Sequence, residues 1–178
     1  MEDSSVFSLQ WSLFPREIAD GITPRDVLER YLAYLRRITL GIIRPTETAL
    51  GLDFRLPGKR GVCLISFLPP DSSDGAITLR ICGGLLVQPR QCHRGELRFS
   101  VLPEQDRVKI LLQLSDYCPL LLGSVTPSFI HRWLYRLTQA AIHRLVTIRF
   151  LKLLYRDLGG KAPVVTVTPV RVRDGRPL

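Results

Sequence analysis

The sequence predicts an α+β domain in which an antiparallel sheet packs one face against a long C-terminal helix. Strand patterns with hairpin-length connections fill the middle of the chain, and such connections join antiparallel strands. A long helical pattern follows from Thr126 to Gly160, and no other segment is long enough to cover the apolar face of the sheet. The 178 residues form one domain with a real core, and 46% hydrophobic residues argue against disorder.

The N-terminal part predicts one strand and two helices. Apolar and polar side chains alternate over residues 7–13, which is typical of a half-buried strand. Residues 15–20 predict a short helix that ends at Gly21. Thr23 and Pro24 are a good N-cap and first position for a second helix, which Gly41 ends.

The middle of the chain is interpreted as strands and turns. Strands are expected at residues 47–56, 62–68, 76–82 and 85–88, and a bulge or bend is expected at Gly83 and Gly84. The clearest hairpin joins residues 95–102 to residues 107–117 through the turn PEQD. Its alternation predicts one buried and one wet face, as in an antiparallel sheet packed on one side.

The C-terminal segment predicts a helix of roughly 50 Å, at 1.5 Å per residue. Thr126 and Pro127 suit its start, and Gly159 and Gly160 supply its end. A helical wheel places one broad apolar arc toward the core: Ile130, Trp133, Leu134, Leu137, Ala140, Ala141, Leu145, Ile148, Leu151 and Tyr155. Arg144 breaks the pattern, because it falls near the middle of this arc.

A second apolar stripe, nearly opposite, consists of Tyr135, Ile142, Val146 and Leu153. It is interpreted as a homodimer seam, as a membrane-surface face, or as a surface covered by the N-terminal helices or the tail. The domain is expected to span residues 1–160, and residues 161–178 form a basic tail rich in proline and valine. The tail is interpreted as an edge strand or a disordered end.

Charge and cysteine content limit the possible functions. The net charge is +9 with a pI near 9.9, which favours anionic lipids, nucleic acids or anionic ligands as partners. The four cysteines lack C-x-x-C spacing and predict reduced thiols in a cytoplasmic protein, although Cys92 beside His93 leaves a zinc site as a minor alternative. No cofactor, resident metal, secretory signal or membrane-spanning helix is predicted.

The order of elements resembles the helix-grip fold of the START-like superfamily, which includes birch-allergen-like proteins, lipid-transport domains and polyketide cyclases. The hairpin GELRFSVLPEQDRVKILLQLSDY and the helix from Thr126 carry the resemblance, which spans roughly residues 5–158. It implies a curved sheet of about six or seven strands that grips the C-terminal helix, with an apolar cavity between them. Members bind lipids, sterols, hormones or aromatic polyketides there, and some catalyse cyclisation. No catalytic residue of the family can be carried over.

Candidate site residues are therefore weighed on their own chemistry. The cavity lining is expected to comprise Arg144, Trp133, Leu137, Ile148, Tyr155, Phe99 and Leu97. Arg144 is interpreted as an anchor for a ligand carboxylate or phosphate, or as a structural cation paired with Asp116 or Glu96, or as a group that reaches water. For Trp133 and Tyr155 the favoured interpretation is ordinary core, with a cavity lining as the alternative. Asp116 and Tyr117 end a strand and are weak candidates for acid–base groups.

Three functions remain open. The preferred function is the binding of a hydrophobic small molecule or lipid between the sheet and the C-terminal helix. This ligand is either anionic or neutral. The second is a cyclase- or dehydratase-like enzyme that uses the same cavity. The third is a binder of anionic membrane surfaces or nucleic acid through the basic helix, and nucleic acid is the less favoured of those two because no exposed aromatic surface for base stacking is evident.

Overall fold

The computed structural model describes residues 6–58, 61–87, 95–117, 144–159, 172–173 and 176–177. The strands are β1 (Val6–Pro15), β2 (Arg44–Thr48), β3 (Gly51–Arg55), β4 (Cys63–Phe67), β5 (Asp71–Ser73), β6 (Ala76–Gly83), β7 (Glu96–Glu104), β8 (Arg107–Tyr117), β9 (Val172–Arg173) and β10 (Arg176–Pro177). The helices are α1 (Arg16–Ala19), α2 (Pro24–Ile38) and a C-terminal helix over residues 144–157.

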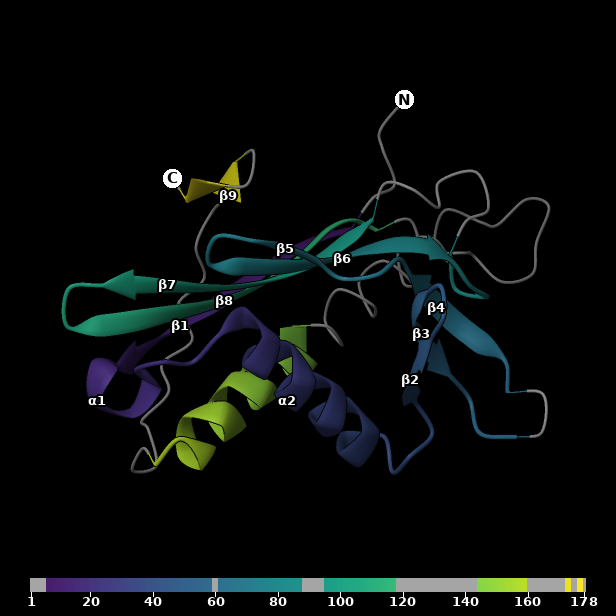
Figure 1. The fold of residues 1–178 in the computed structure, drawn as a ribbon, viewed down its shortest axis with the longest axis horizontal. Helices are drawn as coiled ribbons and strands as arrows, with labels where there is room; N and C mark the ends of the chain where they lie inside the picture. The colour runs from purple at the N-terminus through teal and green to yellow at the C-terminus, as the bar shows by residue number, and fades with distance from the viewer. Residues whose placement is uncertain are drawn as a thin grey trace, which may run out of the picture.

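Eight strands form one antiparallel sheet in the order β1-β8-β7-β6-β4-β3-β2, with β5 paired to β6. The first strand therefore lies beside β8, the last long strand, and their register runs from Val6 opposite Tyr117 to Pro15 opposite Arg107. The β7–β8 hairpin turns at Gln105 and Asp106, so the predicted turn is confirmed. All three helices lie on the same side of the sheet (Figure 1).

Local sequence explains the start of α2. The Thr23 side chain accepts a hydrogen bond from the Asp26 backbone N–H, and the Asp26 carboxylate accepts one from the Thr23 backbone N–H at 2.9 Å. This capping box satisfies two donors that the helix itself cannot. The side chain of Thr23, and then its backbone N–H, hold the pKa of Asp26 below its usual value.

The core lies between the sheet and the two longer helices. Tyr31 of α2 packs edge-on against Phe99 of β7 and against Phe150 of the C-terminal helix, with ring centroids 5.2 Å apart in both pairs. The Tyr34 and Phe150 rings are also in contact, at 5.6 Å. The helix-grip arrangement predicted from the sequence, with a sheet that faces a C-terminal helix and two helices after the first strand, is therefore confirmed.

The buried face of the C-terminal helix differs from the predicted arc. Thr147, Phe150, Leu151 and Leu154 are 0–6% exposed, whereas Leu145, which the wheel placed inside, is 50% exposed. At about 100° per residue, the true face is rotated by roughly one residue position from the predicted one. The reason is that apolar side chains occur on both sides of this helix, because it packs against α2 as well as against the sheet.

The middle strands also required corrections. Residues 47–56 were expected to be one strand, but Ala49 and Leu50 form a turn between β2 and β3. The segment between the strands expected at residues 62–68 and 76–82 contains the short β5, and residues 85 and 86 form a turn where a strand was expected. The expected irregularity at Gly83 and Gly84 is present: Gly84 has φ 118°, and a Cβ there would overlap the Leu64 carbonyl.

Other predictions lie partly or wholly outside the described residues. They include the start of the long helix, Cys92, His93 and most of the tail. Within the tail, β9 and β10 form a two-stranded ladder in which Arg176 lies opposite Arg173. The division into a domain of residues 1–160 and a tail stays a prediction.

Two truncations on one helix test the observed core face. Phe150→Ala should lower the free energy of unfolding by about 3–5 kcal/mol, because it empties the space between Tyr31 and Tyr34. Leu145→Ala, on the exposed side, should change it by less than about 0.5 kcal/mol. Urea unfolding of both variants measures the difference, and a larger loss for Leu145→Ala than for Phe150→Ala would mean that the helix is oriented as the wheel predicted.

Candidate functional site

The inner face of the sheet is lined by residues that sequence analysis assigned to a cavity. Leu97 and Phe99 of β7 are 4% and 0% exposed and belong to the main hydrophobic cluster. Tyr155 is half-buried, with its ring 5.5 Å from that of Phe14 of β1, and Ile148 is half-buried as well. Trp133 and Leu137 lie outside the described residues. Ligand binding by any of these residues stays a prediction.

Arg144 is not part of the buried face. It is exposed at the beginning of the described part of the helix, so the conflict between its charge and an apolar arc does not arise. Its exposure follows from the rotated helix face described above. A role for Arg144 as the anchor of a ligand carboxylate or phosphate stays a prediction.

Two buried hydroxyl groups lie in this part of the core, and sequence analysis missed both. Thr147 is 0% exposed, and its Oγ1 has no hydrogen-bond partner among the described residues. The same holds for the Oη of Tyr34, which is 7% exposed as a residue. Burial raises the pKa of Tyr34, and the charges of Arg149 and Arg37 partly offset that effect. Both hydroxyls are free to bond to a polar group that enters the core.

The weak acid–base candidates end β8. Asp116 is exposed and adopts a left-handed backbone conformation with φ 50°, which marks the irregular end of the strand. Tyr117 lies opposite Val6 in the register with β1. A catalytic role for either residue stays a prediction.

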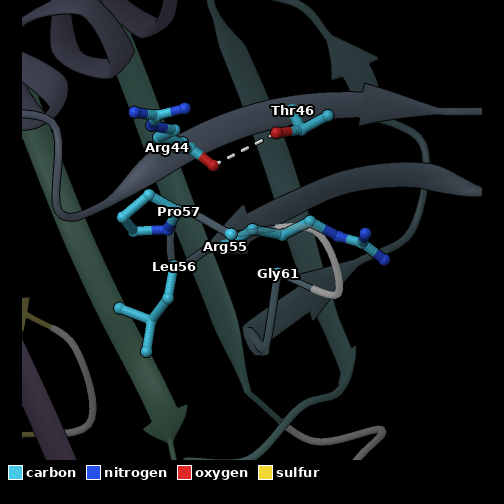
Figure 2. A pocket seen from close by; sticks show the side chains of 7 residues that line it. Arg44, Thr46, Arg55, Leu56, Pro57 and Gly61 are labelled. Carbon is cyan, nitrogen blue, oxygen red and sulfur yellow. Dashed lines mark hydrogen bonds between the residues drawn. The ribbon is translucent and has the colours of Figure 1, made fainter.

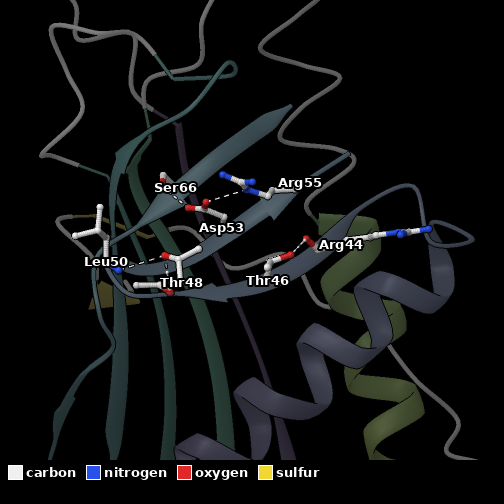
Figure 3. Close-up of polar contacts among 8 residues, drawn as sticks. Arg44, Thr46, Thr48, Leu50, Asp53, Arg55 and Ser66 are labelled. Atoms are coloured by element: carbon white, nitrogen blue, oxygen red, sulfur yellow. Dashed lines mark hydrogen bonds and ion pairs between the residues drawn. The ribbon is translucent and has the colours of Figure 1, made fainter. Parts of the chain in front are cut away.

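A polar cluster occupies the other face of the sheet. Asp53 of β3 is only 7% exposed, although its neighbours Leu52 and Phe54 are buried on the core face. The Ser66 hydroxyl donates to one of its carboxylate oxygens, and Arg55 Nε donates to the other at 3.0 Å (Figure 3). Burial, followed by the charge of Asp53, raises the pKa of the nearby Cys63 thiol. β3 is thus buried on both faces, which alternation alone did not indicate.

Beside this cluster lies an open pocket of about 400 Å³, lined by Arg44, Thr46, Arg55, Leu56, Pro57, Gly58 and Gly61. Arg44 and Arg55 are directly opposite each other in the β2–β3 register. Their guanidinium groups nevertheless point away from one another (Figure 2), and Arg55 is paired with Asp53. The arrangement therefore does not converge on an anion.

The metal, membrane and dimer predictions concern residues both inside and outside the described ranges. The described ranges contain no group of three or more histidine, cysteine, aspartate or glutamate side chains suited to a metal ion. None of the helices described here combines the length and hydropathy that a bilayer crossing requires. Val146 and Leu153 of the proposed dimer seam are partly buried against the core, which fits cover by the chain itself, whereas Tyr135 and Ile142 lie outside the described residues.

Comparison with known proteins gives distant structural similarity alone. No family model matches the sequence, and no curated protein matches it. The NMR solution structure of KanY protein is similar with a TM-score of 0.42 and 12% identity, over 88% of this chain and 99% of that one. The crystal structure of Ara h 8.0201 is similar with a TM-score of 0.38 and 13% identity, over 82% of this chain and 97% of that one. The fold assignment therefore rests on the chain's own elements, and no residue or activity is carried over from either protein.

The polar cluster makes a testable contribution to stability. Asp53→Ala should lower the free energy of unfolding by about 1–3 kcal/mol, because it leaves the partly buried Ser66 hydroxyl and Arg55 without their acceptor. Glu47→Ala is the matched control, since Glu47 is an exposed carboxylate on the neighbouring strand. Chemical denaturation followed by circular dichroism measures both, and an unchanged midpoint for Asp53→Ala would show that the cluster does not stabilise the sheet.

Proposed function

We propose that this protein binds a hydrophobic small molecule or lipid between the sheet and the C-terminal helix. The observation that carries the proposal is the Thr147 hydroxyl, which is fully buried and has no partner among the described residues. A buried polar group without a hydrogen bond costs about 1–3 kcal/mol. A ligand that supplies the missing partner recovers this energy.

The surroundings of Thr147 match the general character of small-molecule sites. Such sites are mostly apolar with a few polar groups that orient the ligand. The hydroxyl is one helical turn from Phe150, which contacts Tyr31 and Tyr34, and the Tyr34 hydroxyl supplies a second unused polar group. The ligand is therefore expected to be a largely apolar molecule with at least one hydrogen-bonding group.

An acidic headgroup on the ligand is supported by charge. Arg37 and Arg149 both lie close enough to Tyr34 for their charges to act on its phenol, and both side chains are exposed. The apolar part of an anionic amphiphile would pack in the core, with its charge near these arginines. A cytoplasmic location belongs to this proposal as an expectation from the reduced thiols. A cyclase-like activity has no comparable support, since Asp116 is exposed.

Native mass spectrometry of the purified protein beside a denatured control is the first test. A mass excess that is lost on denaturation is expected. If the protein is purified empty, titration with anilinonaphthalene sulfonate, an apolar anionic fluorophore, measures binding directly. Saturable binding is expected, and its absence together with an empty mass spectrum would contradict the proposal.

Thr147→Val separates binding from stability. The change keeps the shape of the side chain and removes the unpaired hydroxyl, so the free protein should be as stable as the wild type or more stable by up to about 1 kcal/mol. Affinity for the fluorophore should fall by roughly tenfold, the equivalent of one hydrogen bond.

Thr78→Val is the control for this variant. Thr78 is 9% exposed, on β6 between the core residues Ile77 and Leu79, so it points to the opposite face of the sheet. Thr78→Val should leave the affinity for the fluorophore unchanged. Equal affinities for Thr147→Val and the wild type would show that the hydroxyl does not contact the ligand.

A further inference from the structure

The connection between α2 and β2 lies at the lower edge of the molecule in Figure 1 and carries exposed apolar side chains. Leu40 is 91% exposed, Ile42 is 56% exposed, and Ile38 at the end of α2 is 36% exposed. Leu40 is the most exposed large hydrophobic residue in the described part of the chain. These three residues are called the apolar tip below.

The backbone at Leu40 makes its identity unexpected. Leu40 has φ 51°, a left-handed conformation that leucine rarely adopts and that glycine adopts freely. The Gly41 N–H donates to the Arg36 carbonyl at 2.8 Å, and the Leu40 N–H donates to the Arg37 carbonyl at 3.1 Å. These bonds form a Schellman motif, in which the position of Leu40 is usually occupied by glycine. A leucine here gains nothing from burial and is disfavoured by the backbone.

The tip is held in place by its own hydrogen bonds. The Thr39 hydroxyl donates to the Leu35 carbonyl at 2.8 Å and accepts from the Ile43 N–H at 3.1 Å. The Ile42 N–H donates to the Thr39 carbonyl at 2.9 Å, and Arg44 Nε donates to the Gly41 carbonyl at 3.2 Å. The apolar side chains are therefore presented by a preformed loop, which reduces the entropy lost on binding.

Positive charge surrounds the tip. The stretch from Arg30 to Thr46 contains four arginines and no acidic residue, and Arg36, Arg37 and Arg44 are exposed. The C-terminal helix adds Arg149, which lies with Arg37 around Tyr34. An apolar tip flanked by arginine side chains is complementary to a surface that is apolar inside and anionic outside.

We propose that the α2–β2 loop is a membrane-docking site that inserts Leu40 and Ile42 into the interface of an anionic lipid bilayer. Arg36, Arg37 and Arg44 contact the headgroups. The side chains that insert are those that the folded chain leaves exposed. The inference does not depend on ligand binding in the core.

A protein partner fits these observations less well. A stable protein interface involves about 20–30 residues a side. Three apolar side chains around a protruding turn offer much less contact area, whereas membrane attachment by a shallow insertion needs only a few apolar residues together with basic ones.

Vesicle co-sedimentation with the full chain tests the site. Wild-type protein should bind vesicles of phosphatidylcholine mixed with phosphatidylserine, and should bind pure phosphatidylcholine vesicles more weakly. Leu40→Asn should lower the partition coefficient roughly 5- to 10-fold, because one large apolar side chain no longer enters the bilayer. Asparagine tolerates the left-handed conformation, so the variant should melt at the same temperature as the wild type or higher.

Leu50→Asn is the matched control. Leu50 is 81% exposed in the β2–β3 turn, away from the apolar tip, and its replacement should leave vesicle binding unchanged. Arg36→Gln should lower binding to anionic vesicles, and the loss should shrink as salt is raised.

Three results would overturn the proposal. They are absence of wild-type binding to anionic vesicles, equal losses for Leu40→Asn and Leu50→Asn, and binding by Leu40→Asn that matches the wild type. The last result, with a loss confined to Arg36→Gln, would indicate surface attraction without insertion.

Discussion

The contact of Tyr31 with Phe99 and Phe150 is the packing interaction on which the rest of the fold depends. It joins α2, the centre of the sheet and the C-terminal helix, three elements that are far apart in the sequence. Burial raises the pKa of the Tyr31 phenol, so the group stays neutral inside the protein. The contact helps to hold both helices over the sheet, where the buried hydroxyls of Thr147 and Tyr34 also lie.

Hairpins and caps were predictable because their signals are local. The alternation of apolar and polar residues predicted the two faces of β7, and Thr23 with Pro24 marked the start of α2. The β2–β3 turn was missed because Ala49 and Leu50 are not typical turn residues. The predicted buried face of the C-terminal helix was wrong at Leu145. The helix packs against both the sheet and α2, whereas a helical wheel assumes a single packing partner.

The candidate sites were less predictable because they depend on burial. Thr147 is an ordinary helix residue in the sequence, and only packing shows that its hydroxyl has no described partner. Asp53 alternates with apolar neighbours and suggests a wet face, yet Ser66 and Arg55 accompany it in a buried position. Leu40 precedes a helix-ending glycine, so the sequence gives no sign that it adopts the left-handed conformation itself.

The composition of the edge strand β2 has a consequence for self-association. β2 is the last strand in the order of the main sheet, and an edge strand can recruit a strand from another molecule. Arg44 places an exposed positive charge on this edge strand, and the adjacent Pro45 has no N–H to donate. A second chain that approached β2 would meet electrostatic repulsion and an incomplete ladder. The charge of Arg44 and the missing N–H of Pro45 thus protect the sheet from growing into an aggregate.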